Sequence, residues 1–271
     1  MSIQETFPDP PDDLFKWASH GPNETRSRTA MGWMYELYDT MRCGSTYAHG
    51  SWGYTVLRTI YSDESDRLWP IALAKLRLWV TKYFIHYGRL TENKPDGTVN
   101  FELGRRFVLE VVESKELEAL QLPDLAKANQ NDIKSLTGIF DAWLRQAVKT
   151  DEVQFNRNPR FVDFLIIDEG SLRSLAALPE ETIPLAPISM QERRARTTVY
   201  GRPYLWLIDS QAVRRYQGID DMENYNGLMK LKARDIPYAW FQRAPRSEDE
   251  YHIFKRSEAP DGSGVWFVGS F

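Results

Sequence analysis

The pattern of hydrophobic positions first predicts a strand that leads into a long helix. The run from Gly53 to Tyr61, GYTVLRTIY, is rich in β-branched and aromatic residues, and the SDESD that follows offers good helix N-caps. From Leu68 onward, apolar residues recur every three or four positions, which predicts an amphipathic helix to about Tyr87. Pro70 must then lie in the first turn, because a proline further inside removes a backbone donor.

Further along the chain the pattern changes from helical to extended. Residues 91–100 have the composition of a loop, and helices are expected from about Phe101 and over Asn131–Lys149. Near the C-terminus the segments GLMKLKA, YAWFQR, HIFKR and GVWFVGSF indicate a terminal β meander.

Turn-forming residues and prolines indicate how the chain is divided into segments. Residues 1–30 are polar and contain several turn formers, so we predict a flexible polar arm there. A single α/β domain is expected over 31–271, with a long loop at 179–203 where prolines break the periodicity.

One pattern occurs three times and predicts the fold class. Two apolar residues are followed by an acid, with further apolar residues four and seven positions after it, and the acids are Glu113, Asp168 and Asp209. Continuous apolar runs precede Asp168 and Asp209, as in strands that are buried on both faces. The unit is therefore strand, acid and short helix. Its repetition predicts an α/β fold, with α+β as the alternative, built on a mixed sheet covered by helices.

Two interpretations of these acids remain open. A carboxylate at a strand end caps the next helix by accepting its first free N–H groups. Alternatively, side chains at the carboxyl ends of strands converge on the ligand crevice of an open α/β sheet. Asp168 and Asp209 would then hold a cation or recognise a guanidinium or amine. Ser210 and Ser62 both lie at predicted helix starts, where backbone N–H groups favour an anion. Ser210 is the better candidate of the two for a catalytic hydroxyl, and capping is the plain alternative for both.

Composition narrows the chemistry. The 271 residues are 42% hydrophobic and carry a net charge of −4, which does not suggest a generally basic DNA-binding or membrane-surface protein. The one cysteine, Cys43, excludes an internal disulfide framework. Without paired histidines, GxGxxG or GxxxxGK[ST], we predict no metal and no cofactor. No secretory or membrane-spanning run is visible, so we expect a cytoplasmic protein without a membrane partner. The sequence does not determine the oligomeric state.

A basic segment departs from the acidic average. Between Arg193 and Arg256 there are thirteen basic residues against eight acids. Arginine forks interleaved with aromatic rings such as Tyr204 and Trp206 suit phosphates and unstacked bases, which predicts an RNA-binding face. The alternative is a solvated surface above core aromatics. The arginines assigned to this face are Arg193, Arg194, Arg196, Arg202, Arg214 and Arg215.

Three runs carry a resemblance: WGYTVLRTIYSDESDRLWPIALAKL, GRRFVLEVVESKEL and RFVDFLIIDEGSL. They resemble a group of intracellular filamentous-fungal proteins over roughly Gly50 to Gln217. Within that group, the overall pattern is similar to the arginine-containing cyclodipeptide synthases of natural-product biosynthesis. This resemblance implies a transferase that takes aminoacyl-tRNAs, arginyl-tRNA among them, and releases a cyclic dipeptide without a cofactor.

The resemblance also implies roles for particular residues. The arginine face would bind the tRNA, and Asp168 or Asp209 would pair with the arginyl guanidinium. Asp168, Asp209 and Ser210 are then the expected catalytic residues. Because the ester is already activated, catalysis would consist of positioning an amine and transferring a proton. The expected substrate-binding residues are Glu113, Tyr204 and Trp206.

Two other functions remain open on the sequence. The first is a small-molecule tailoring enzyme or ligand binder, in which Trp52, Tyr54, Trp206 and Trp240 clamp an apolar substrate. The second is a non-enzymatic interaction protein that docks through the 179–203 segment and the terminal strands. The first alternative does not need the arginine face. The second predicts normal folding and unchanged partner binding when Asp168 and Asp209 are both changed to Asn.

Overall fold

The computed structural model shows strands and helices that alternate through most of the described chain. The described residues are 7–8, 33–34, 37, 50–90, 95–148, 158–180, 190–191, 203–215, 227–244, 256–259, 262 and 264–268. In chain order the elements are β1 (Thr55–Arg58), α3 (Asp63–Leu90), α4 (Pro95–Arg105), β2 (Glu110–Val112), α5 (Lys115–Leu120), η2 (Leu125–Lys127), α6 (Gln130–Val148), α7 (Pro159–Val162), β3 (Asp163–Ile167), α8 (Glu169–Ala176), β4 (Tyr204–Asp209), α10 (Ser210–Arg215), β5 (Leu228–Lys232), η4 (Ala233–Asp235), α11 (Ile236–Arg243), β6 (Arg256–Glu258) and β7 (Val265–Phe267). Most of the predicted arm at 1–30 and of the loop at 179–203 lies outside these residues.

The strands of the described chain form one mixed sheet in the order β2-β1-β3-β4-β5-β7-β6. β1 runs parallel to both β2 and β3, whereas β4 is antiparallel to both β3 and β5. At the far edge β7 is parallel to β5 and antiparallel to β6. The α/β class and the mixed sheet predicted from the repeated unit are therefore confirmed.

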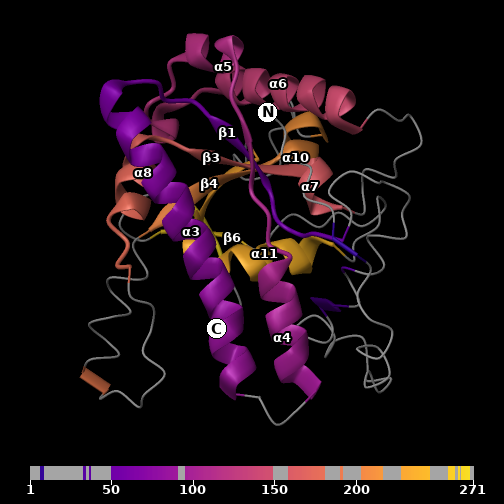
Figure 1. Cartoon of the computed structure of the whole chain (residues 1–271). Coiled ribbons are helices and arrows are strands. Elements are labelled where there is room, and N and C mark those ends of the chain that lie inside the picture. Colours follow the sequence, from indigo (N-terminus) through magenta and orange to yellow (C-terminus); the bar gives the residue numbers. More distant parts are fainter. Residues whose placement is uncertain are drawn as a thin grey trace.

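Helices cover the sheet on both faces (Figure 1). Buried side chains of α3, α4, α8 and α11 join one hydrophobic cluster, and those of α5, α6 and α7 join the other. α10 contributes Ala212 to the first cluster and Val213 to the second. Successive residues of a strand point to opposite faces, so Leu165 of β3 belongs to the first cluster and Ile166 to the second. This two-sided burial explains why β3 has a continuous apolar sequence.

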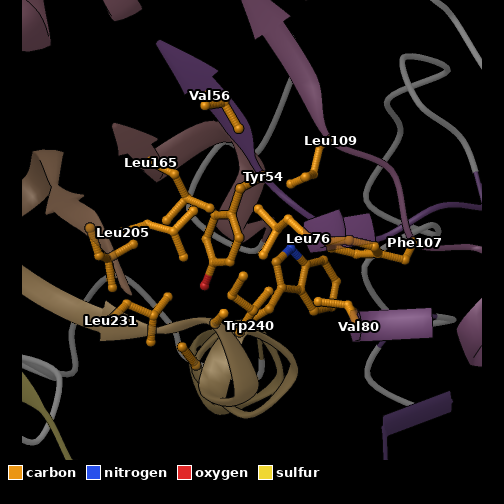
Figure 2. Close-up of a cluster of buried hydrophobic side chains, with 14 of the residues drawn as sticks. Tyr54, Val56, Leu76, Val80, Phe107, Leu109, Leu165, Leu205, Leu231 and Trp240 are labelled. Carbon is orange, nitrogen blue, oxygen red and sulfur yellow. The ribbon is translucent and has the colours of Figure 1, made fainter. Parts of the chain in front are cut away.

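The first cluster is centred on Trp52, which is completely buried. Its indole Nε1 donates to the carbonyl of Leu103 at 2.7 Å. Four rings lie within about 6 Å of it, at centroid distances of 4.7 to 6.1 Å: Phe84, Phe107, Trp240 and Phe241. Figure 2 shows Phe107 and Trp240 in this cluster with Tyr54 and the leucines of the neighbouring strands. Trp52 thus connects α3, α4 and α11 beside the sheet.

Gly53, directly before β1, is required by a close approach of two backbones. Its φ is +131°, and a Cβ built there would lie 2.1 Å from the carbonyl oxygen of Val108. The hydrogen bond from the Val108 N–H to the Trp52 carbonyl, at 2.9 Å, holds the two segments together. A side chain at this position would therefore separate β1 from the segment that leads into β2.

Two predictions for the first half of the chain are wrong. α3 begins at Asp63, so Pro70 lies inside the helix and not in its first turn. The helix starts early because the hydroxyl of Ser62 accepts the Ser65 N–H at 3.2 Å, while the Ser62 N–H donates to the Ser65 hydroxyl at 2.8 Å. The expected loop at 91–100 is also helical from Pro95 onward, because a proline is compatible with the first turn of α4.

The C-terminal part contains strands, as predicted, but also an unexpected helix. β5 and β7 match two of the four segments assigned to the meander. Most of a third segment, HIFKR, lies outside the described residues, and β6 begins at its last residue, Arg256. The fourth, YAWFQR, lies in α11, whose Trp240 and Phe241 pack into the first cluster. Its apolar run has no strand periodicity, and Pro237 near the helix start favours α11.

We predict that Trp52→Ala lowers the free energy of unfolding by about 3–5 kcal/mol, because it leaves a cavity among four rings and removes the donor to Leu103. Urea titration of the folded protein measures this change. The matched control is Ile71→Ala on α3, where the side chain is 42% exposed and the expected change is small. Equal losses in the two variants would contradict the central place of Trp52 in the core.

Candidate functional site

Asp168 and Asp209 follow neighbouring strands but lie at opposite ends of the sheet. β3 and β4 are antiparallel, with Asp163 opposite Asp209 and Ile166 opposite Trp206. Asp168 therefore lies beside the start of β4, and Asp209 beside the start of β3. The expectation that these two acids meet in one crevice is wrong, because it requires both strands to run in the same direction.

Asp168 is a buried cap whose oxygens are fully used. Its Oδ1 accepts the N–H of Ser171 at 2.8 Å and the hydroxyl of Ser171 at 2.7 Å. Its Oδ2 accepts the N–H of Leu125 at 3.2 Å and the indole Nε1–H of Trp206 at 2.6 Å. A carboxylate offers about four lone-pair positions, so little capacity remains for a substrate guanidinium. The capping interpretation is confirmed for Asp168, which also ties η2 and β4 to the start of α8.

Glu113 is not a cap and does not lie with the other predicted binding residues. Ser114 caps α5 instead, accepting the Leu117 N–H at 3.2 Å. Glu113 accepts from Arg58 at 2.9 Å, and that guanidinium lies over the rings of Tyr61 and Trp69. β1 and β3 separate the strand that precedes Glu113 from β4, which carries Tyr204 and Trp206.

Tyr204 and Trp206 belong to a group of aromatic and lysine side chains on one face of β4, β5 and β7. We call this group the aromatic–lysine surface. The strand register places Lys230 opposite both Trp206 and Trp266, and Lys232 opposite Tyr204. The Lys230 ammonium lies 4.8, 5.0 and 5.4 Å from the ring centroids of Tyr204, Trp206 and Trp266, respectively. The Lys232 ammonium lies 5.9 Å from the Trp266 ring. The members of the aromatic–lysine surface are Tyr204, Trp206, Lys230, Lys232 and Trp266.

The aromatic–lysine surface is partly accessible. Trp206 is 4% and Lys230 9% exposed, whereas Tyr204, Lys232 and Trp266 are half-buried. The Tyr204 hydroxyl lies against Gly170 in the first turn of α8, where a Cβ would come within 2.8 Å of it. Burial, and then the nearby carboxylates of Asp168 and Asp124, raise the pKa of Tyr204 to about 12. The phenol therefore keeps its proton at neutral pH and remains a hydrogen-bond donor.

Sequence reasoning missed three members of this surface. Lys230 and Lys232 alternate with apolar residues in LMKLK, and this period of two is the signal that places both lysines on one face of β5. Trp266 joins them only through the parallel pairing of β5 with β7, and nothing in the local sequence indicates that pairing.

The other predicted catalytic residues lie at the opposite end of the sheet. Asp209 caps α10 by accepting the Ala212 N–H at 3.0 Å, and it also accepts from Arg243 at 3.1 Å. The Ser210 hydroxyl is fully buried and donates to the carbonyl of Val162. Capping is thus confirmed for Asp209, and Ser210 is not arranged as a nucleophile, since no base lies at its hydroxyl in the described structure.

The predicted arginine face falls largely outside the described residues. Outside the described residues lie four of these arginines: Arg193, Arg194, Arg196 and Arg202. The side chain of Arg215 is also not described. Arg214, 43% exposed on α10, is ion-paired with Asp141 of α6. The arginine face therefore stays a prediction.

The proposed aromatic clamp does not form. Trp52, Tyr54 and Trp240 are completely buried in the first cluster, as Figure 2 shows for Tyr54 and Trp240. Trp206 belongs to the second cluster, on the other face of the sheet. Because successive side chains of a strand point to opposite faces of the sheet, Trp206 lies on the other side of the sheet from the remaining three rings. Those three rings belong to the hydrophobic core and do not share a pocket with Trp206.

Metal-ligand clusters and membrane spans are also absent from the described residues. No group of three or more His, Cys, Asp or Glu side chains is arranged there to hold a metal ion. Among the helices within the described ranges, none has both the length and the apolar composition that crossing a bilayer requires.

We predict that Asp168→Asn lowers the free energy of unfolding by about 1–3 kcal/mol, because an amide nitrogen cannot accept the hydrogen bonds that one carboxylate oxygen accepts. Trp206→Phe removes only one of the four donors, so a smaller loss is expected. Urea unfolding compares both variants with Glu169→Gln, whose exposed ion pair with Arg173 contributes little. A loss no larger in Asp168→Asn than in Glu169→Gln would contradict this assignment.

Comparisons with known proteins identify no relative of this chain. A scan against protein-family models, a search of the curated proteins and a search of the solved structures each find no match.

Proposed function

We propose that this chain is an aminoacyl-tRNA-dependent, peptide-bond-forming enzyme that makes an arginine-containing cyclic dipeptide in natural-product biosynthesis. The observation that carries the proposal is the aromatic–lysine surface. It combines the half-buried rings of Tyr204 and Trp266, on which bases stack, with the half-buried Lys232, whose ammonium attracts phosphates. These are the requirements of single-stranded nucleic acid, and the aminoacylated 3′ end of a tRNA is single-stranded.

The position of the surface in the fold supports the proposal. Tyr204 lies at the carboxyl end of β3, beside the start of α8, and ligands of open α/β sheets bind at such edges. Asp168 acts there as a positioning residue, because it fixes the Trp206 indole and the first turn of α8 together. The acid thus contributes rigidity to the site without touching the substrate.

The chemistry that the proposal requires is modest. The amine nitrogen of one aminoacyl group attacks the ester carbonyl carbon of the other, the ester C–O bond breaks, and the amine proton passes to the released ribose oxygen. A second attack of the same kind closes the ring. The ester is already activated, so positioning supplies most of the acceleration. The neutral Tyr204 phenol is the donor placed to stabilise the developing oxyanion at this edge.

The two acids that the sequence offered as partners of the substrate guanidinium are both occupied by other hydrogen bonds. The Asp168 oxygens already accept four hydrogen bonds, and Asp209 holds Arg243 at the far end of the sheet. Neither acid is therefore proposed as the arginine contact. The catalytic roles expected for Asp168, Asp209 and Ser210 are replaced by positioning and capping roles.

The direct test feeds isotopically labelled arginine to bacteria that express the chain and analyses their extracts by mass spectrometry. We expect a new labelled diketopiperazine that is absent with the empty vector and strongly reduced by Tyr204→Phe. The control Lys134→Gln, an exposed lysine on α6, should leave the product unchanged. If folded protein gives no labelled product in the bacteria, and none in vitro when arginyl-tRNA is supplied, the result favours a tailoring enzyme or an interaction protein.

RNA binding tests the carrying observation separately. Fluorescence anisotropy measures the affinity for a short single-stranded RNA that ends in CCA. We expect Trp266→Ala to weaken binding by about 1–3 kcal/mol through lost stacking. Lys232→Gln should reduce the slope of log affinity against log salt by about 0.7, the share of one phosphate contact. Lys134→Gln is again the control, and equal affinities of all variants would contradict the assigned surface.

A further inference from the structure

A buried acid at the amino end of β3 has no hydrogen-bond donor. Asp163 is completely buried, and within the described structure neither of its carboxyl oxygens has a hydrogen-bond partner. It lies directly opposite Asp209 in the pairing of β3 with β4. Two acids thus face the same side of the sheet in register, at the end away from the aromatic–lysine surface.

One guanidinium lies between the two acids. The Arg243 side chain, 8% exposed, extends from the last turn of α11. It donates to Asp209 at 3.1 Å and to Gln211 at 3.0 Å, while its Nε lies 3.5 Å from Asp163 without a hydrogen bond. With both acids ionised, two buried negative charges would share one positive charge. With Asp163 neutral, the Asp209–Arg243 pair is balanced.

Among the residues that the structure describes, the other charged and titratable groups around Asp163 do not supply a second cation of equal strength. Tyr54, directly before β1, is buried and neutral, because burial raises its pKa and Asp163 raises it further. Arg214 of α10 lowers the pKa of Asp163 only as the smallest contribution, and its guanidinium is paired with Asp141. Burial, as the main cause, together with Asp209, raises the pKa of Asp163 well above the ordinary aspartate value.

We propose that Asp163, Asp209 and Arg243 form a proton-operated latch, which holds the end of α11 against the sheet while Asp163 is protonated and loosens it when that proton leaves. The released proton goes to solvent, and no other group is consumed. This inference goes beyond the proposed function and does not depend on it.

α11 is the element on which such a latch acts. Arg243 is its last residue, and the contacts to Asp163 and Asp209 join that end to two strands at once. Trp240 and Phe241 of the same helix pack against Trp52 in the first cluster.

The direction of the pH dependence follows from linkage. The pKa of Asp163 is higher in the latched state than in an open or unfolded state. Its stabilising contribution is therefore complete below the ordinary aspartate pKa of about 3.9 and is lost as pH rises to the latched-state value. Opening of α11 should accordingly increase about tenfold per pH unit across that interval and level off above it.

Hydrogen exchange measured by mass spectrometry on the full chain tests the latch. As pH increases above about 4, and after correction for intrinsic exchange, wild-type α11 amides should show this tenfold rise per unit until it levels off at the latched-state pKa of Asp163. Asp163→Asn keeps the site neutral and should remove the rise. Glu169→Gln is the control, because this exposed acid of α8 pairs with Arg173 and belongs to a different helix from α11. It should keep the wild-type profile.

A second measurement keeps the proposal falsifiable if Asp163→Asn does not fold. Infrared spectroscopy of the wild-type protein detects the carbonyl band of a protonated carboxyl directly. That band should persist while the opening of α11 increases and should disappear at the pH where the increase levels off. The proposal is overturned if wild-type α11 shows no pH-dependent opening. It is equally overturned if Asp163→Asn retains the wild-type rise, or if the carboxyl band is missing at neutral and acid pH.

Discussion

The antiparallel pairing of β4 with β3 is the constraint on which the rest of this structure depends. It follows a parallel group of three strands, β2, β1 and β3, and reverses the direction of the sheet at its centre. As a result, Asp168 and Asp209 lie at opposite ends of neighbouring strands. One end of the sheet then carries Asp168 with the aromatic–lysine surface, and the other carries the buried acids with Arg243.

The two ends use carboxylates in different ways. Asp168 is surrounded by donors from three elements, so its burial is compensated and it rigidifies the edge next to Tyr204. Asp163 is buried as deeply but has no hydrogen-bond donor among the described residues, so burial raises its pKa. At equal burial, the supply of donors therefore distinguishes the positioning role of Asp168 from the pH-dependent role proposed for Asp163.

Much of the fold could be predicted from local patterns. The strand–acid–helix unit gave the α/β class, and the apolar stripe over Asn131–Lys149 matches α6 closely. Strand direction is not encoded locally, so the separation of Asp168 from Asp209 could not be predicted. Likewise, Asp163 sits in the apolar run FVDFLII, and only the register with Asp209 shows that two acids share one guanidinium.

The central claim is that the single-stranded 3′ end of a tRNA lies on the aromatic–lysine surface. The most direct measurement is photo-crosslinking of a CCA-ended RNA that carries a photoreactive base in that end, followed by mapping of the linked peptides by mass spectrometry. The account predicts that crosslinks concentrate on peptides with Tyr204, Lys232 or Trp266 and disappear when excess unlabelled RNA competes. Crosslinks confined to other parts of the chain, or crosslinks that competitor RNA does not reduce, would contradict it.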